Sequence, residues 1–216
     1  MSASPRPAAG SAPSGPASMP RPTTVPYIAR WSAEQSLTPD VVATARGLAY
    51  PDETLHDRDQ GGALWARTAL RRGQGRPDFG GIHSQRQRRA MQRLLCQVCG
   101  GPADRTQDGV LWLVEDRRGD WKGWPEGLVT THPPVCLPCA RLSVAQCHHL
   151  LTGPWVALRV RDSVVEGVYG RPYHLQEGRL VRGEKAVVLY DNPGIRWVVA
   201  SQLTRTLRGC TIVQLL

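Results

Sequence analysis

The sequence has no hydrophobic run that approaches the roughly 20 residues needed to cross a bilayer as a helix. Its first residues form no apolar signal segment and are mostly proline, alanine, serine and glycine. We therefore expect no membrane contact and a cytoplasmic location. Since the cytoplasm keeps thiols reduced, disulfides are the less favoured use for the six cysteines.

Lysine is almost missing, because Lys122 and Lys185 are the only lysines among 27 basic residues. Arginine, alanine, glycine and proline are all abundant, which is typical of a GC-rich genome. The net charge of +9 favours a nucleic-acid partner. The same charge can follow from that genomic bias, so the sequence leaves open whether it is functional.

A catalytic constellation is also missing from the sequence. Asp57 and Asp59 have no third metal ligand or paired acid at useful spacing, so a charged hairpin turn is the simpler account of them. The C-terminal part contains no acid, base or nucleophile group of a recognisable kind. A non-enzymatic protein is therefore favoured.

Two Cys-x-x-Cys pairs are what the sequence does contain, and four thiolates from two such pairs suit a tetrahedral structural zinc ion. The ligands of this predicted zinc cofactor are Cys96, Cys99, Cys136 and Cys139. Gly100 and Gly101 follow the first pair and permit the left-handed backbone of a zinc knuckle. A redox dithiol would need a thioredoxin-like βαβ setting, which neither pair has.

The second pair precedes apolar residues at helical spacing, and Pro154 lies beyond them as a stop. This places the pair at a helix N-terminus, where the helix dipole stabilises thiolates. A knuckle, a hairpin and a helix in this order predict a treble clef, and a zinc ribbon is the runner-up. A further metal ligand could come from Cys147, His148 or His149. Because four ligands are already present, we favour a structural interpretation, in which Cys147 lies on a buried helix face and the two histidines end the helix.

The most basic stretch runs from residue 81 to 95, with Ser84 as the expected N-cap of a helix. Arg86, Arg89 and Arg93 share one face of that helix and Arg88 lies on its flank. Such a face suits phosphates. An ordinary solvated helix face is the alternative.

The remaining segments predict an α+β fold. Residues 109–114 read as a strand, and Trp121 and Trp124 after them either stack on bases or, as favoured, form core. Hairpins are expected at 155–161 with 164–169 and at 186–190 with 197–200, then a helix at 201–208 and a strand at 210–213. Together these strands predict a small antiparallel β-barrel-like domain.

Four regions follow along the chain. They are a disordered tail at 1–26, an extension at 27–80 with a short helix closed by Gly47 and a hairpin, the basic helix plus zinc module at 81–152, and the β-domain at 153–216.

The segments CQVCGGPAD and PPVCLPCARLS, with HSQRQRRAMQRLL before them and GVLWLVED between them, resemble a group of uncharacterised actinobacterial treble-clef zinc proteins. This resemblance implies the fold and the zinc ligands, and no activity. A more distant resemblance is to the His-Asn-His nucleases, many of which hold their treble clef with four cysteines.

The nuclease pattern has an Asp-His pair on the first hairpin strand, an Asn before the second cysteine pair and often a His directly after it. In this chain His132 is the only histidine of the insert and lies next to Pro133. The expected Asn is missing and Ala140 follows Cys139. The resemblance therefore brings no hydrolytic machinery with it.

The sequence thus predicts a structural zinc protein that binds DNA or RNA phosphates through its arginine helix, by way of Arg86, Arg88, Arg89 and Arg93. A protein-interaction adaptor is the alternative. A diverged metal-dependent nuclease with His132 or His83 as base is the third hypothesis.

Overall fold

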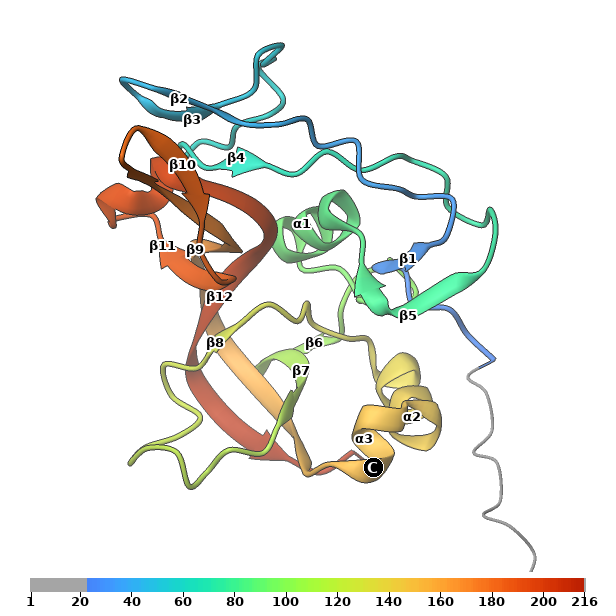
Figure 1. The fold of residues 1–216 in the computed structure, drawn as a ribbon. Coiled ribbons are helices and arrows are strands. Elements are labelled where there is room, and N and C mark those ends of the chain that lie inside the picture. The colour runs from blue at the N-terminus through green and yellow to red at the C-terminus, as the bar shows by residue number, and fades with distance from the viewer. Residues whose placement is uncertain (1–22, 216) are drawn as a thin grey trace, which may run out of the picture.

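Two long antiparallel strands form the centre of the computed structural model, which describes residues 23–215 (Figure 1). Strand β9 spans Trp155–Gln176 and strand β12 spans Val198–Val213. They pair from Val198 opposite Pro172 to Val213 opposite Ala157, with two β-bulges on the way. Bulges increase the local twist, so the pair forms a bent ribbon on which the other elements pack.

Further strands extend this ribbon into an eight-stranded sheet whose main path is β4-β12-β9-β7-β6. The added strands are β4 (Leu64–Trp65), β6 (Arg105–Thr106), β7 (Gly109–Glu115), β8 (Val129–Thr130), β10 (Arg179–Arg182) and β11 (Ala186–Leu189). Two separate two-stranded sheets pair β1 (Ala29–Trp31) with β5 (Pro77–Ile82) and β2 (Val42–Thr44) with β3 (Gly47–Ala49). Strand β4 is parallel to β12, and the other pairs are antiparallel.

The helices are α1 (Ser84–Arg93), α2 (Leu137–Gln146), α3 (His148–Thr152) and the 3₁₀ helix η1 (Pro193–Trp197). Helix α1 packs against β12 and confirms the predicted basic helix. Its N-cap is His83, whose ring nitrogen accepts from the backbone N–H of Arg86, so the prediction of Ser84 as N-cap was wrong by one residue. Ser84 is instead the first helical residue and is buried.

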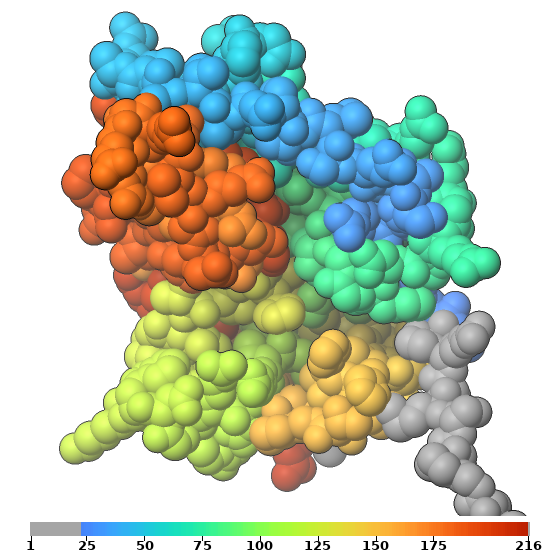
Figure 2. Space-filling model, viewed as in Figure 1, coloured from blue at the N-terminus to red at the C-terminus, as the bar shows by residue number. Residues whose placement is uncertain are grey.

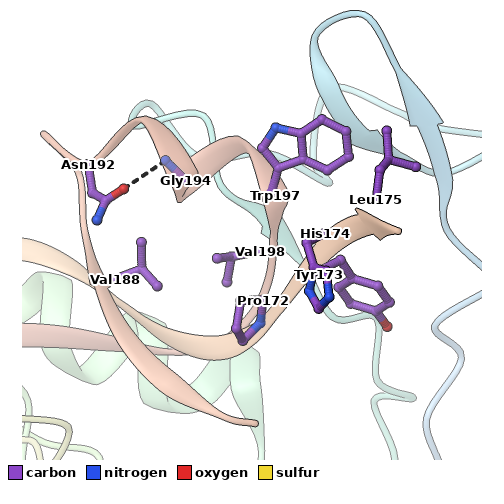
Figure 3. A pocket seen from close by; sticks show the side chains of 9 residues that line it. All are labelled: Pro172, Tyr173, His174, Leu175, Val188, Asn192, Gly194, Trp197 and Val198. Carbon is purple, nitrogen blue, oxygen red and sulfur yellow. Dashed lines mark hydrogen bonds between the residues drawn. The ribbon is translucent and has the colours of Figure 1, made fainter. Parts of the chain in front are cut away.

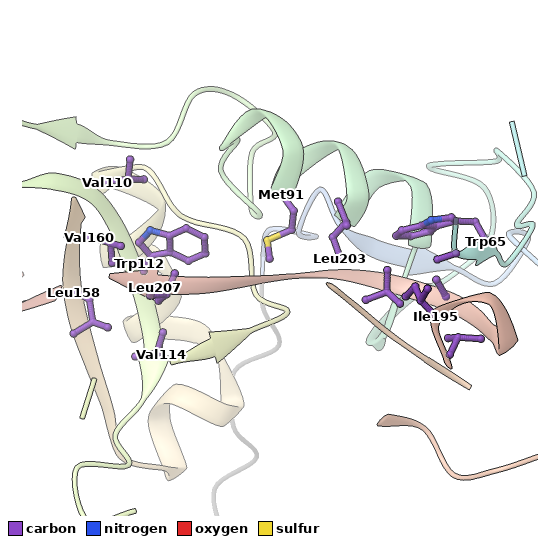
Figure 4. Close-up of a cluster of buried hydrophobic side chains, with 14 of the residues drawn as sticks. Trp65, Met91, Val110, Trp112, Val114, Leu158, Val160, Ile195, Leu203 and Leu207 are labelled. Atoms are coloured by element: carbon purple, nitrogen blue, oxygen red, sulfur yellow. The ribbon is translucent and has the colours of Figure 1, made fainter. Parts of the chain in front are cut away.

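One hydrophobic core joins the cysteine-bearing segment to the C-terminal strands. Strand β7, which lies between the two cysteine pairs, pairs with β9 from Val110 opposite Val160 to Glu115 opposite Trp155. Figure 4 shows Trp112 of β7 beside Leu207 of β12, and Met91 of α1 beside Leu203 of the same strand. Both parts therefore share one sheet, in which β7 contributes Trp112 to the cluster with Leu207 and Leu111 to a second cluster that contains Cys96.

The N-terminal extension covers one side of this core. In the space-filling view it lies in blue and cyan along the top of the molecule, against the C-terminal strands in orange (Figure 2). Leu64 of β4 pairs with Val199 of β12, and Thr23 hydrogen-bonds to the side chain of Gln146 in α2. Of the predicted disordered tail at 1–26, residues 1–22 lie outside the described residues.

The predicted helix ending at Gly47 is wrong, because the chain forms the β2–β3 hairpin there. Gly47 has φ of +115°, and the hydroxyl of Thr44 accepts from the N–H of Arg46 and donates to the carbonyl of Gly47. This side-chain turn competes with helical bonding. Leu48 is then fully buried against Tyr50, which anchors the hairpin.

Three predictions for the C-terminal strands were also wrong. Residues 155–169 form no hairpin, since Asp162 and Ser163 continue β9 opposite β12. Residues 201–208 are strand, because Leu203 and Leu207 pack into the core from β12. Strand β11 pairs with β9 and not with 197–200. The described part of the sheet ends at β4 and β6 without closing into a barrel.

Candidate metal centre

The ligand atoms of four cysteines all lie within 4.8 Å of one another. They are the predicted ligands Cys96, Cys99, Cys136 and Cys139. The sulfurs of Cys99 and Cys136 are 3.9 Å apart, far beyond the ~2.05 Å of a disulfide bond. The cysteines of the chain are all free. Within residues 23–215 this is the only group of three or more metal-binding side chains that lie so close together.

The first pair sits in a tight loop closed by its own backbone. The N–H of Cys96 donates to the carbonyl of Gly101 at 2.7 Å, and the N–H of Gly100 donates to the carbonyl of Cys96 at 2.8 Å. Gly100 has φ of +77°, as the predicted knuckle requires. A side chain at Gly100 would also meet the ring of Tyr27. Glycine is therefore needed here for backbone conformation and for space.

The second pair sits at the start of α2, as predicted. Cys136 is the N-cap residue and Cys139 lies in the first turn, with Pro138 between them. The N–H of Ala140 donates to the carbonyl of Cys136 at 2.9 Å. Both cysteines of the second pair therefore lie at the N-terminal end of α2, the end at which the helix dipole is positive.

Backbone hydrogen bonds hold the two pairs in position. The N–H of Gln97 donates to the carbonyl of Pro134 at 3.0 Å, and the N–H of Val135 donates to the carbonyl of Leu111 in β7 at 3.0 Å. The N-terminal segment also binds this loop, since the N–H of Tyr27 donates to the carbonyl of Val98 at 2.8 Å. The sheet and the N-terminal segment thus fix where the four sulfurs lie.

This donor set fits a zinc ion. With Zn–S bonds of about 2.3 Å, two sulfurs of a tetrahedral site lie about 3.8 Å apart. The sulfurs of Cys99 and Cys136 are 3.9 Å apart, which is close to that value. Burial, together with hydrogen bonding to Cys136 and the charge of Cys96, raises the pKa of the Cys139 thiol. A bound cation would reverse this effect by pairing with the thiolate. Four sulfur ligands also complete the tetrahedron, as in structural sites, and leave no position for a substrate.

Cys147, His148 and His149 do not belong to this group. Cys147 ends α2 and begins α3, and it is half-buried. His148 and His149 are exposed in α3. The helix therefore breaks at Cys147, where the sequence predicted that it continues to the histidines.

The predicted arginine face is divided by the structure. Arg86 is buried, and its guanidinium donates to both carboxylate oxygens of Glu34 at 2.6 and 2.7 Å. It also donates to the carbonyls of Tyr27 and Ala29, each at 2.7 Å. The prediction that Arg86 contacts phosphates is therefore wrong, because its donors are used inside the protein.

Glu34 is the partner that the sequence did not reveal. It is fully buried and also accepts from the N–H groups of Trp31 and Arg71. Burial alone would raise the pKa of Glu34, but the hydrogen bonds from Arg86 and Trp31 outweigh burial and lower it to about 2. The carboxylate is therefore ionised at neutral pH and fixes the N-terminal segment on α1.

The other three arginines differ from Arg86. Arg88 is half-buried, with its guanidinium 4.4 Å from the centre of the Trp65 ring. Arg89 and Arg93 are exposed and have no partner among the described residues. Two of the four predicted arginines thus remain free for a ligand.

The candidate acids and bases have structural roles. Asp57 accepts from Arg67, which lowers the pKa of its carboxyl, and Asp59 accepts from the Trp65 indole and the Tyr190 hydroxyl. His83 is fully buried and its Nε2 lies 3.2 Å from the carbonyl of Ala69. Burial, followed by the charge of Arg86, lowers the pKa of His83. A buried histidine cannot reach a substrate, which removes one of the two predicted nuclease bases.

His132, the second candidate base, is exposed in the loop between β8 and α2. In residues 23–215 it belongs to no group of three close metal-binding side chains. A nuclease site needs a second catalytic-metal ligand beside its base. The geometry around His132 therefore gives no support to hydrolysis.

A cavity of about 410 Å³ lies away from the cysteines, between β9, β11 and η1 (Figure 3). Pro172, Val188 and Val198 form apolar walls, and Trp197 lies at its side. The Asn192 side chain already accepts from the N–H of Gly194 at 2.8 Å. Its lining offers no pair of acid and base groups, so it does not add a catalytic site.

No helix among residues 23–215 combines the length and the apolar character that a membrane span requires. Comparison with protein-family models, with curated proteins and with solved structures gave no match to this chain.

Proposed function

We propose that this chain is a cytoplasmic, non-catalytic zinc protein with a treble-clef centre that contacts nucleic acid through its phosphates. The order of elements supports the treble clef: the Cys96 loop, the β6–β7 hairpin and the cysteines at the start of α2. A zinc ribbon would need the second pair on a hairpin, and Cys136 caps a helix instead. The resemblance to treble-clef proteins agrees with this proposal.

The observation that carries the nucleic-acid proposal is the free pair Arg89 and Arg93. They lie one turn apart on the exposed face of α1, and neither has a partner among the described residues. Arg72 adds a third exposed cation, with its guanidinium 5.2 Å from the centre of the Tyr27 ring. The backbone carbonyl of Tyr27 accepts from the guanidinium of Arg86 in α1, and its N–H donates to the carbonyl of Val98 in the first cysteine loop.

The test is the salt dependence of DNA and RNA binding. Each arginine that contacts a phosphate releases a counterion, so its loss lowers the slope of log K against log salt by about 1. We expect Arg89→Ala with Arg93→Ala to lower the slope by about 2 on any sequence. Binding isotherms between about 50 and 200 mM salt would measure this change.

The matched control is Arg179→Ala with Arg196→Ala, two exposed arginines on other elements without a partner in the described chain. This variant should keep the wild-type slope. Equal losses from both variants would show that only net charge matters, and would contradict a site on α1. A wild-type protein that binds no nucleic acid at low salt would exclude the proposal and favour the adaptor hypothesis.

A further inference from the structure

The cavity between β9, β11 and η1 is lined by aromatic and apolar side chains and opens to solvent. Figure 3 shows Trp197, His174 and Tyr173 on one side of it and Asn192 on the other. His174 is exposed, and Leu175 beside it is 51% exposed. Among the described residues, the lining contains no aspartate, glutamate, lysine or arginine. A ligand of this cavity should therefore be uncharged and largely apolar.

Three side chains of the lining also offer unused hydrogen-bond donors. The indole N–H of Trp197 has no acceptor among the described residues. The side-chain amide of Asn192 uses its oxygen to accept from Gly194, which leaves its N–H groups free. The hydroxyl of Tyr173 accepts from Arg182, so its own proton is free as well. The lining is thus suited to a ligand that supplies hydrogen-bond acceptors.

A proline-rich segment in the polyproline II conformation is a ligand of this kind. Its backbone carbonyls form no internal hydrogen bonds, and its prolines have no N–H groups that need acceptors. Its rings are apolar and uncharged. Aromatic-lined grooves bind such segments because the polyproline II helix is formed in advance and loses little entropy on binding.

We propose that the cavity binds residues 7–20 of a second copy of the chain. This segment contains four prolines and no charged residue, so it matches the cavity in charge. Two of its prolines, Pro13 and Pro16, are three residues apart. Because polyproline II has three residues per turn, these two rings face the same side and can contact the aromatic walls together.

The reach of the chain favours a second copy over the same copy. Thr23, the first described residue, hydrogen-bonds to Gln146 in α2, and α2 lies on the side of the molecule opposite β11 (Figure 1). Pro13 is ten residues before Thr23, so polyproline II of 3.1 Å per residue carries it at most about 31 Å away. A folded chain of this size is about 40 Å across, and the segment would have to pass around its surface. The proline pair is therefore too close to Thr23 for the cavity of its own chain.

Association of the full chain is the first test. So short a segment covers less surface than the roughly 1,200 Å² of a stable specific interface, so the binding should be weak and reversible. Sedimentation from about 10 μM to about 1 mM covers the matching range of dissociation constants. We expect an average mass that rises with concentration, and a monomer throughout the range would overturn the proposal.

Two variants weaken the contact from its two sides. Pro13→Ala with Pro16→Ala removes both rings and frees the backbone of the segment, which should raise the dissociation constant about 10-fold. Leu175→Asp places a charge in the uncharged lining and should have an effect of about the same size.

Each of these variants has a matched control in the same chain. Pro5→Ala with Pro22→Ala removes two prolines outside the segment. Leu37→Asp changes a leucine of similar exposure, 60%, that does not line the cavity. Both controls should associate like wild type. Equal weakening in the controls would overturn the assignment of the contact to this segment and this cavity.

A mixture of the two weakened variants tests whether the contact joins different copies. The double proline variant keeps an intact cavity, and the Leu175→Asp variant keeps an intact segment. An equal mixture should therefore form 1:1 complexes at a concentration where neither variant associates alone. A mixture that stays monomeric would overturn binding between copies.

A synthetic peptide of residues 7–20 tests the cavity directly. It should shift the NMR signal of the Trp197 indole N–H and dissociate the complexes of the full chain. The same peptide with Pro13→Ala and Pro16→Ala should do neither at equal concentration. An unshifted Trp197 signal at saturating peptide would overturn the cavity as the binding site. The inference goes beyond the proposed function and depends on neither zinc nor nucleic acid.

Discussion

Replacing Cys136 with serine should remove the bound zinc and unfold the protein around the cysteine centre. Serine offers no thiolate, and a site with three sulfurs binds zinc far more weakly. Structural zinc contributes about 10 to 16 kcal/mol to the folding of small zinc peptides, as much as the whole stability of a typical domain. We expect one zinc per wild-type chain by elemental analysis, and loss of both the metal and the cooperative thermal transition in the variant.

Cys147→Ser is the matched control, because Cys147 is half-buried near the centre but lies outside the group of four. This variant should keep its zinc and its melting temperature. A wild-type protein that folds cooperatively after complete metal removal would contradict a structural role for the centre. So would equal loss of zinc from the two variants.

Replacing Arg86 with alanine should lower the free energy of unfolding by about 3 to 5 kcal/mol. The change leaves the carboxylate of Glu34 buried without its main partner, and breaking a buried ion pair from one side has this cost. Equilibrium unfolding in urea would measure it. Arg89→Ala, on the exposed face of the same helix, should change stability by less than about 0.5 kcal/mol.

The contribution of the Arg86–Glu34 pair to the free energy of unfolding depends on pH. The folded pKa of Glu34 lies near 2, below its ordinary value of 4.5. The ionised carboxylate therefore adds stability above pH 4.5, and this contribution is lost as the pH falls toward 2. Glu34→Gln should flatten that part of the acid unfolding curve.

An Arg86→Ala protein as stable as wild type would contradict the first of these two predictions, because it would show that the Arg86–Glu34 pair contributes little to the free energy of unfolding.

Local signals account for what the sequence predicted correctly. Three of these signals can each be recognised within a few residues, and the structure agrees with all of them. They are the Cys-x-x-Cys spacing, the glycine at position 100 and the apolar pattern of 109–114. Helix α1 was predicted from the same kind of signal. These features need no knowledge of the rest of the chain.

The errors come from ambiguous or distant signals. Leu203 and Leu207 are four residues apart, a spacing that one face of a helix and one face of a strand both satisfy. Asp162 and Ser163 suggested a turn, and only their pairing with β12 shows that the strand continues. Helical spacing placed Arg86 on the same face as Arg93. The structure instead pairs Arg86 with Glu34, which lies 52 positions earlier in the chain.

The parallel pairing of β4 with β12 has a consequence for synthesis on the ribosome. Leu64 leaves the exit tunnel long before Val199, its neighbour in the sheet, has been translated. Contacts between such distant positions form late and slow folding. We expect the 27–80 region to stay open to proteases in nascent chains that stop before β12, and to become resistant once the strand emerges. Protease digestion of stalled ribosome complexes of increasing length would show where that change occurs.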